Sequence, residues 1–196
     1  MYFEVFLLVT YFEERESFTE TDAPQRMPGK YPTVTIIVPA WNESTTLLGT
    51  VESLLSLNYP KDRLSLFIVD DGSTDDTLQV AQAYAKHPQV RIFSKENGGK
   101  YTALNLGIEV STSELIGCLD ADSFVDERAL IEIIPFFDNP QVMAVTPSVQ
   151  IHKPDNMLRK MQAAEYMIGE YRDFGCGWGL PRSSPIGANR RGERFC

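Results

Sequence analysis

Short apolar runs that alternate with helix-like segments constrain the fold of this chain more than any other feature. The runs are rich in β-branched residues and nearly free of polar ones, which is typical of strands buried on both faces. Five strands are predicted, at residues 34–39, 64–70, 90–93, 115–120 and 142–151. Helices are predicted over 44–57, after Ser73, over 100–108 and over 127–137. This alternation predicts an α/β fold in which helices cover both faces of a mostly parallel sheet.

Two of the predicted helices carry a capping signal at their start. Ser73 is followed three residues later by Asp76, and Ser123 is followed three residues later by Asp126. This spacing is that of a capping box, in which the serine hydroxyl accepts a hydrogen bond from the first turn. We therefore expect the two serines to cap the helices that follow them.

Polar clusters follow each of the first four predicted strands. They read PAWNE, DDGSTDD, SKENGGK and DAD, in the order of the chain. In open parallel sheets, ligands bind at the carboxyl ends of the strands, and these clusters all lie at that edge. A binding site explains four polar clusters at one edge of the sheet better than four unrelated turns do.

The fourth cluster contains two aspartates, Asp120 and Asp122, separated by a single alanine. In an extended segment, residues two apart point to the same side, so the two carboxylates can converge. Convergent carboxylates suit Mg²⁺ or Mn²⁺, which prefers oxygen ligands and often shares them with substrate phosphates. The alternative is that Asp122 caps the next helix while Asp120 is solvated. The three neighbouring clusters favour the metal site.

The second and third clusters also allow two interpretations each. Asp70 or Asp71 could accept a hydrogen bond from a base or a ribose hydroxyl, or both could belong to a plain strand-to-helix turn. The turn accounts for Asp75 and Asp76, since acidic residues are favoured near a helix N-terminus. In the third cluster, the backbone N–H groups of two glycines could bind a diphosphate together with Lys100. The alternative there is a glycine turn with a solvated lysine.

The first cluster combines an aromatic residue with polar ones. Trp41 could stack on a planar base, and Asn42 or Glu43 could hydrogen-bond to that base. In the alternative interpretation, Asn42 or Ser44 caps the following helix and Trp41 is a packing residue. The two interpretations have nearly equal support from the residues alone.

Four segments, TIIVPAWNE, FIVDDGSTDDT, NGGKYTALNLGI and LIGCLDADSFVDE, resemble in this order the nucleotide-sugar half of a family 2 glycosyltransferase. KMQAAEY, after the last predicted strand, is similar to the segment that follows in processive membrane synthases of hyaluronan, chitin or poly-N-acetylglucosamine. The resemblance covers residues 31–171. It implies a GT-A fold, which is Rossmann-like, and a nucleotide-diphosphate sugar as donor, most often UDP-linked.

The resemblance also implies roles for single residues. Trp41 stands where the family places a residue against the base, Asp71 matches the position that contacts uracil, and Lys100 matches a donor-binding lysine. Asp120 and Asp122 match the D-x-D motif that handles the ribose and the metal on the diphosphate. The full set of candidates is Pro39, Trp41, Glu43, Asp70, Asp71, Lys100 and Asp120 for the substrate, with Asp120 and Asp122 for Mg²⁺ or Mn²⁺.

The implied reaction is inverting transfer of the sugar to a polysaccharide or lipid-linked acceptor. The metal would neutralise charge on the departing nucleoside diphosphate. The family's general-base motif and its Q-x-x-R-W motif do not occur in residues 153–196, so no catalytic residue is assigned and the activity of this chain stays open. We interpret the chain as truncated, with a sheet that is incomplete on the acceptor side.

The chain is divided into four parts on the basis of composition. They are an apolar segment at 1–12, an acidic linker at 13–30, the nucleotide-sugar-binding domain at 31–171 and an irregular tail at 172–196. The apolar segment is shorter than the roughly 20 residues of a spanning helix. It is interpreted as the remnant of a membrane span, an interfacial helix or a short packing segment.

The net charge restricts which molecules the chain can bind, and the cysteine content indicates the redox state of its cellular compartment. The net charge of −9 argues against nucleic acid, which requires a basic face. The three cysteines have neither zinc-binding spacing nor a disulfide framework, which favours a reducing compartment. Intact family proteins act at the cytoplasmic face of a membrane. We expect this chain to be cytoplasmic, with membrane association through residues 1–12 as an open alternative.

Three functions are weighed. The first is metal-dependent glycosyl transfer, and the second is a catalytically incomplete fragment that only binds the nucleotide sugar. The third, a nucleotidyltransferase, ranks low because its glycine-rich loop would follow the first strand, and PAWNE contains no glycine.

Overall fold

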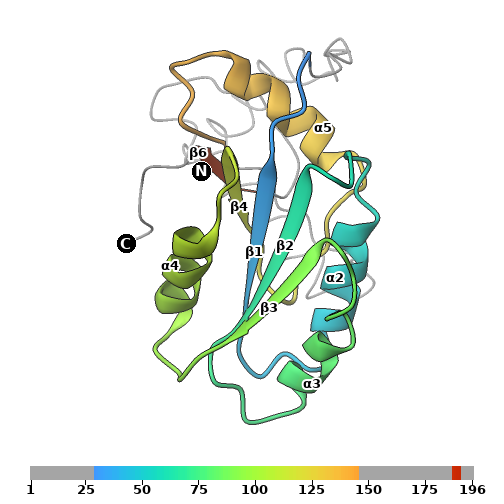
Figure 1. Ribbon diagram of the computed structural model, residues 1–196, viewed down its shortest axis with the longest axis vertical. Helices are drawn as coiled ribbons and strands as arrows, with labels where there is room; N and C mark the ends of the chain where they lie inside the picture. Colours follow the sequence, from blue (N-terminus) through green and yellow to red (C-terminus); the bar gives the residue numbers. More distant parts are fainter. Residues whose placement is uncertain (1–28, 146–186, 191–196) are drawn as a thin grey trace, which may run out of the picture.

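The computed structural model describes residues 29–145 and 187–190, which form a six-stranded sheet covered by helices (Figure 1). The strand order is β3-β2-β1-β4-β6-β5. The strands are β1 (Val34–Ala40), β2 (Leu64–Asp70), β3 (Val90–Ser94), β4 (Leu115–Cys118), β5 (Ala144–Val145) and β6 (Gly187–Arg190). The helices are α2 (Leu47–Leu55), α3 (Thr77–Gln82), α4 (Lys100–Val110) and α5 (Ala129–Ile133), and α5 continues into the 3₁₀-helix η1 (Ile134–Asp138).

The first four strands form the parallel part of the sheet. β1 lies between β2 and β4 and is parallel to both, and β2 is parallel to β3. All seven residues of β1 are buried, as expected for a central strand that is covered on both faces. The predicted α/β fold, with a mostly parallel sheet and helices on both faces, is confirmed.

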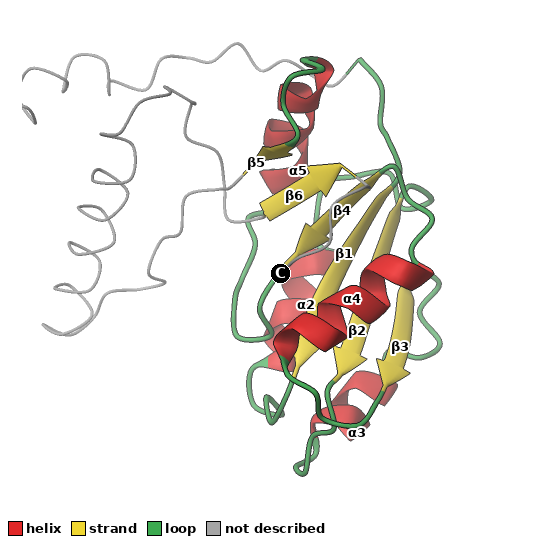
Figure 2. Cartoon of the chain, turned by 90° about the vertical axis from the view of Figure 1, so that its left-hand side faces the viewer, coloured by secondary structure: helices red, strands yellow, loops and turns green. Residues whose placement is uncertain are grey.

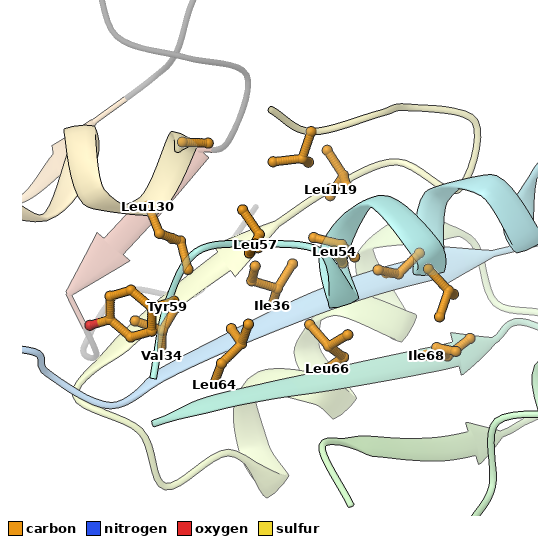
Figure 3. Packing of buried hydrophobic residues seen from close by; sticks show 14 of the residues in the cluster. Val34, Ile36, Leu54, Leu57, Tyr59, Leu64, Leu66, Ile68, Leu119 and Leu130 are labelled. Atoms are coloured by element: carbon orange, nitrogen blue, oxygen red, sulfur yellow. The ribbon is translucent and has the colours of Figure 1, made fainter. Parts of the chain in front are cut away.

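Alternate residues of β1 face two separate hydrophobic clusters. Val34 and Ile36 belong to the larger cluster with Leu54 of α2 and Leu130 of α5 (Figure 3). Val38 and Ala81 of α3 belong to the same cluster. Ile37 packs with Ala103 and Leu104 of α4 on the opposite face, and Figure 2 shows α4 on that side. The two layers hold the strand ends in a fixed register, and so they position the loops that follow the strands.

Both capping predictions are wrong. α3 begins at Thr77 and α5 at Ala129, and neither helix has a side-chain cap hydrogen bond. The Ser73 hydroxyl instead accepts a hydrogen bond from the N–H of Asn42, at 3.0 Å. The Ser123 hydroxyl lies 3.3 Å from a carboxylate oxygen of Asp122. Ser73 therefore binds another loop and Ser123 binds the residue before it, and in both cases the helix starts later.

Two strand predictions differ from the structure at their ends. The predicted strand at 115–120 ends at Cys118, so the two aspartates of the DAD cluster lie in the loop that follows β4. The predicted strand at 142–151 contains the two-residue strand β5, and its residues from 146 onward lie outside the described part.

Part of the predicted irregular tail is a strand. Gly187–Arg190 form β6, which pairs antiparallel with both β4 and β5. Glycine and asparagine are poor strand formers, but pairing uses backbone groups, and the open edge of β4 supplies unpaired N–H and C=O groups. The sheet thus continues beyond β4, where sequence composition predicted no strand.

Several predicted segments lie outside the described residues. These are the apolar segment at 1–12, nearly all of the acidic linker, the KMQAAEY segment and the rest of the tail. Within residues 29–145 and 187–190, no helix is long and apolar enough to cross a membrane.

Candidate functional site

A pocket of about 420 Å³ opens at the carboxyl ends of β1, β2 and β4. Figure 2 shows this edge of the sheet, where the arrowheads of β2 and β3 end. The residues that line it are Pro39, Ala40, Trp41, Glu43, Asp71, Asn97, Gly99, Lys100, Asp120, Ala121 and Asp122. All four polar clusters contribute to it, as the sheet topology predicts.

The structure brings seven of the eight candidate residues to this pocket, and Asp70 is the exception. The Asp70 side chain is buried and accepts hydrogen bonds from the N–H of Ser73, at 3.3 Å, and from the hydroxyl of Ser94, at 3.2 Å. Asp70 therefore ties the end of β2 to the end of β3 and to the turn that follows. The roles of the seven lining residues toward a ligand remain predictions.

Asp71 is buried at the base of the pocket and holds the loop between β3 and α4. Its carboxylate accepts hydrogen bonds from the N–H groups of Gly98 and Gly99, at 3.1 and 2.7 Å, and pairs with Lys95 Nζ at 2.5 Å. The hydroxyl of Thr102 lies 3.5 Å from the same carboxylate. We name this set of contacts, from Lys95, Gly98, Gly99 and Thr102 to Asp71, the Asp71 latch.

The Asp71 latch changes the prediction for the glycine turn. In one of the two interpretations the N–H groups of Gly98 and Gly99 bind a diphosphate, but in the structure they already bind the chain's own carboxylate. Lys100 is then the part of the third cluster that presents a donor to the pocket. The turn does bind an anionic group, and that group is the carboxylate of Asp71.

The hydrogen bonds of the latch keep Asp71 ionised. Burial favours the neutral form of the carboxyl group, but the hydrogen bonds from Lys95, Gly98 and Gly99 outweigh it. The pKa of Asp71 is therefore below its ordinary value of 3.8. Gly72 adopts a φ of +71°, and a Cβ placed there would lie 2.6 Å from the backbone nitrogen of Asn97. Only glycine allows the two loops to approach this closely.

Asn42 joins the first two polar clusters. Its backbone has a φ of +56°, and its side-chain oxygen accepts a hydrogen bond from the N–H of Thr74, at 2.8 Å. The N–H of Ser44 donates to Asp75 at 3.2 Å. Neither Asn42 nor Ser44 caps α2, which begins at Leu47 and has no side-chain cap. The capping alternative for this cluster is therefore wrong, and the polar residues fix one loop to the other.

Trp41 and Glu43 form one wall of the pocket. Trp41 is 55% exposed, so it is not the interior packing residue of the alternative interpretation. The N–H of Glu43 donates to the hydroxyl of Thr77 at 2.8 Å, and its carboxylate accepts a hydrogen bond from Thr46 at 2.7 Å. An exposed indole beside an anchored carboxylate can stack on a flat ring and accept a hydrogen bond from it.

Lys100 and Asp120 form an ion pair within the pocket. The distance from Lys100 Nζ to the nearer Asp120 carboxylate oxygen is 2.5 Å, and both side chains are more than half exposed. The hydrogen bond to Asp120 is the main reason that the pKa of Lys100 is raised. Partial burial opposes this rise, and the negative charges of Asp120 and Asp122 add to it. A cation of the chain is thus already bound to the first aspartate of the DAD cluster.

Asp120 and Asp122 reach the same pocket, although not in the expected way. They follow the end of β4, and Asp122 lies in a turn rather than in an extended segment. Asp122 does not cap α5, since that helix begins at Ala129. In the part of the chain that the structure describes, no group of three His, Cys, Asp or Glu side chains could hold a metal. Two carboxylates fit a Mg²⁺ or Mn²⁺ that takes its other ligands from water and phosphate.

Three lining residues and one anchoring residue were not predicted, whereas the N–H group of Gly99 had been considered as a diphosphate donor. Asn97 lies in the third cluster and Ala121 in the fourth, so membership in a cluster was the available signal. Ala40 lies between Pro39 and Trp41 in the first cluster. Lys95 also belongs to the third cluster, but its partner Asp71 is distant in sequence, and no pattern pairs the two.

Comparison with known sequences gives a family and a set of relatives. The sequence model of Glycosyl transferase family 2 matches residues 35–191. The poly-beta-1,6-N-acetyl-D-glucosamine synthase of Staphylococcus epidermidis is 36% identical over 135 residues, which are 68% of this chain and 32% of the synthase. The synthase of the same name from Staphylococcus aureus strain COL is 30% identical over 168 residues, which are 85% of this chain and 40% of that one. The chain spans about a third to two fifths of these relatives.

Solved structures share the fold. The mannosyltransferase PcManGT from Pyrobaculum calidifontis, in complex with GDP-Man and Mn²⁺, aligns with a TM-score of 0.66 and 25% identity, over 94% of this chain and 52% of that one. TarS 1-349 of Staphylococcus aureus, in complex with UDP-GlcNAc, aligns with a TM-score of 0.56 and 22% identity, over 62% of this chain and 36% of that one. The predicted GT-A-like fold is confirmed by these similarities.

Proposed function

This chain belongs to glycosyl transferase family 2, and on that premise we propose that its pocket binds the nucleoside diphosphate of a sugar donor. The observation that carries the proposal is the convergence of all four polar clusters on one pocket at the carboxyl ends of the parallel strands. The pocket offers an exposed aromatic ring, carboxylates, and a lysine ammonium group. These are the groups that a base, a ribose and a diphosphate require.

Each part of the donor has a proposed partner. Trp41 stacks on the base, and Asp71 or Glu43 accepts a hydrogen bond from it. One oxygen of Asp71 accepts a single N–H, from Gly99, and therefore keeps a free acceptor site. Lys100 pairs with the diphosphate, and Pro39 forms the wall beside Trp41. Asp70, which is buried under the turn, supports the site without touching the donor.

The metal is proposed to be Mg²⁺ or Mn²⁺, held by Asp122 and Asp120. When bound, it would neutralise negative charge that develops on the departing nucleoside diphosphate. The mannosyltransferase that shares this fold was solved with Mn²⁺, which supports the choice of metal.

The donor is proposed to be UDP-N-acetylglucosamine. The relatives that are 30% and 36% identical are named as synthases of an N-acetylglucosamine polymer, and TarS was solved with UDP-GlcNAc. The names of the same relatives support a growing polysaccharide as the acceptor, and a lipid-linked glycan is the alternative that we propose. Because the chain spans only part of those proteins, transfer may be tested separately from donor binding.

The binding proposal is tested by calorimetry with UDP and Mn²⁺. We expect UDP to bind in the presence of Mn²⁺, with GDP weaker by about tenfold or more, since a pocket that hydrogen-bonds one base rejects another. Asp122→Asn should weaken the Mn²⁺-dependent binding, whereas Lys30→Met, at the opposite end of β4, should leave it unchanged. If UDP does not bind, or binds equally well to Asp122→Asn, the proposal is wrong.

A second assay separates an enzyme from a binding fragment. The chain is incubated with UDP-[¹⁴C]GlcNAc, Mn²⁺ and a poly-N-acetylglucosamine oligomer, and labelled product is measured by chromatography. Transfer to the oligomer would establish the glycosyltransferase. Donor binding without transfer would favour the alternative, a catalytically incomplete nucleotide-sugar-binding fragment.

A further inference from the structure

The Lys100–Asp120 ion pair places a positive charge at the proposed metal site. Lys100 is the first residue of α4, and Asp120 follows the end of β4, so two elements bring the pair together across the pocket. The 2.5 Å contact uses one carboxylate oxygen of Asp120, which is a candidate metal ligand. A divalent cation that enters the free pocket would meet the lysine ammonium group at this carboxylate.

The pocket has little capacity to bind both cations at once. Within the described residues, Asp120 and Asp122 have no third acidic, histidine or cysteine side chain that could complete a metal site with them. Lys100 Nζ lies 2.5 Å from a carboxylate oxygen of Asp120, and Asp122 lines the same pocket. A metal ion of charge +2 would be repelled by the ammonium group over a few ångströms, in a pocket that is only partly screened by water.

We propose that Lys100 excludes the divalent cation from the free pocket and releases Asp120 to it only when a diphosphate binds. Lysine can make this change because its ammonium is a compact charge on a flexible stem, with three donors that suit carboxylate or phosphate. A diphosphate carries more negative charge than one carboxylate, so it draws the lysine away from Asp120. Metal binding then depends on the nucleotide. This inference rests on the proposed function of the pocket.

The test measures Mn²⁺ binding by calorimetry, and free Mn²⁺ by electron paramagnetic resonance, with and without saturating UDP. For the wild-type chain we expect weak binding of Mn²⁺ alone and a strong gain when UDP is present. For Lys100→Met we expect binding of Mn²⁺ alone to tighten by about tenfold, since the repelling charge is gone. The gain caused by UDP should shrink in this variant, because the lysine that couples the two ligands is missing.

Three control variants locate the effect. Lys100→Arg retains the positive charge, so Mn²⁺ alone should bind more weakly to it than to Lys100→Met. Lys30→Met removes a lysine that is even more exposed than Lys100 and pairs with Glu114 at 3.3 Å before β4 begins, and it should change nothing. Asp122→Asn added to Lys100→Met should abolish the gain, since it removes one of the two carboxylates.

Each outcome decides the inference. If Lys100→Met binds Mn²⁺ alone no tighter than wild type, or if Lys30→Met gains as much, the exclusion is refuted. UDP could fail to bind the wild-type chain while Lys100→Met still gains affinity for Mn²⁺. That result would support the exclusion of Mn²⁺ by Lys100, but it would refute both the release of Asp120 by the nucleotide and the proposed function. If UDP and Mn²⁺ bind independently in the wild-type chain, the proposed function stands and the coupling is refuted.

Discussion

The substitution Asp71→Asn should destabilise the fold by much more than Asp70→Asn, although the two aspartates are adjacent and both are buried. In the Asp71 latch, the three closest neighbours of the carboxylate can only donate: the Lys95 ammonium and the N–H groups of Gly98 and Gly99. The hydroxyl of Thr102 is more distant, at 3.5 Å. An asparagine has one acceptor oxygen and one NH₂ group. Whichever way the amide is turned, its NH₂ group faces a donor.

The expected cost follows from these contacts. A buried donor left without an acceptor costs about 1–3 kcal/mol, and the loss of a charge-assisted hydrogen bond costs about 1.5–3 kcal/mol. Lys95 is 24% exposed and can partly turn to water, so we take the lower half of the range. We predict a loss of about 3 kcal/mol from the free energy of unfolding, which is a large share of the about 5–15 kcal/mol typical of a domain.

Asp70→Asn is the matched control. Asp70 accepts one hydrogen bond from a backbone N–H and one from the hydroxyl of Ser94. The hydroxyl can rotate to accept a hydrogen bond from the new NH₂ group and, because Ser94 is exposed, can donate to water, so the contact between the two side chains is kept. We predict a loss of about 1 kcal/mol or less.

The assay is urea unfolding of the three chains at 25 °C and pH 7, followed by circular dichroism. Equal m-values would show that the variants unfold from the same compact state. The explanation is refuted if Asp71→Asn loses no more stability than Asp70→Asn.

The same carboxylate predicts a pH dependence. The pKa of Asp71 is lower in the folded chain than its ordinary value of 3.8, so its contribution is fully present above pH 3.8. The contribution is lost as the pH falls through the lower, folded-state value. Wild-type stability should therefore fall more steeply below pH 4 than that of Asp71→Asn. Parallel pH profiles would contradict this assignment.

Three further predictions concern neighbouring residues. Gly72→Ala should lower the free energy of unfolding by about 2 kcal/mol, because it places a Cβ at positive φ against the Asn97 backbone. An unchanged urea midpoint would contradict this close approach. Trp41→Ala should weaken UDP binding by about tenfold in calorimetry, since base stacking is worth about 1–3 kcal/mol. It should not reduce the free energy of unfolding, because the indole is 55% exposed. A loss of stability as large as the loss of binding free energy would make Trp41 a packing residue. Burial raises the pKa of the Cys118 thiol to about 11, so almost none of it is in the reactive thiolate form at pH 8. Peptide mass spectrometry after iodoacetamide treatment at pH 8 should therefore find Cys118 almost unlabelled. Rapid labelling in the folded chain would refute its burial.

The parallel strands and the edge that carries the site could be predicted from sequence because they depend on simple periodic patterns. The run at 34–40 is apolar except for Thr35, and it is the central strand β1. The polar clusters follow the strands, and topology alone brings them together. Trp41 and Asp122 were therefore found at the pocket without knowledge of any side-chain contact.

The partners of the polar residues could not be predicted, because they are chosen in three dimensions. Ser73 has the spacing of a helix cap, but its hydroxyl binds Asn42 from another loop. The glycine N–H groups at 98 and 99 suit any anion, and sequence cannot reveal that Asp71 fills this role. β6 escaped prediction for a related reason, since its stability comes from the edge of β4 and not from its own composition.

The position of β6 affects the order in which the chain can fold during synthesis. Cys118 of β4 pairs with Gly187, so the partner strand emerges about 70 residues after β4 itself. At a synthesis rate of roughly 5–20 residues per second, β4 waits about 4–14 s for this neighbour. During that interval β1, β2 and β3 can already pair, while the outer edge of β4 exposes hydrogen-bonding groups to other nascent chains. Chaperones that shield strand edges would be needed most in this interval, and a faster supply of residues 187–190 should reduce aggregation during expression.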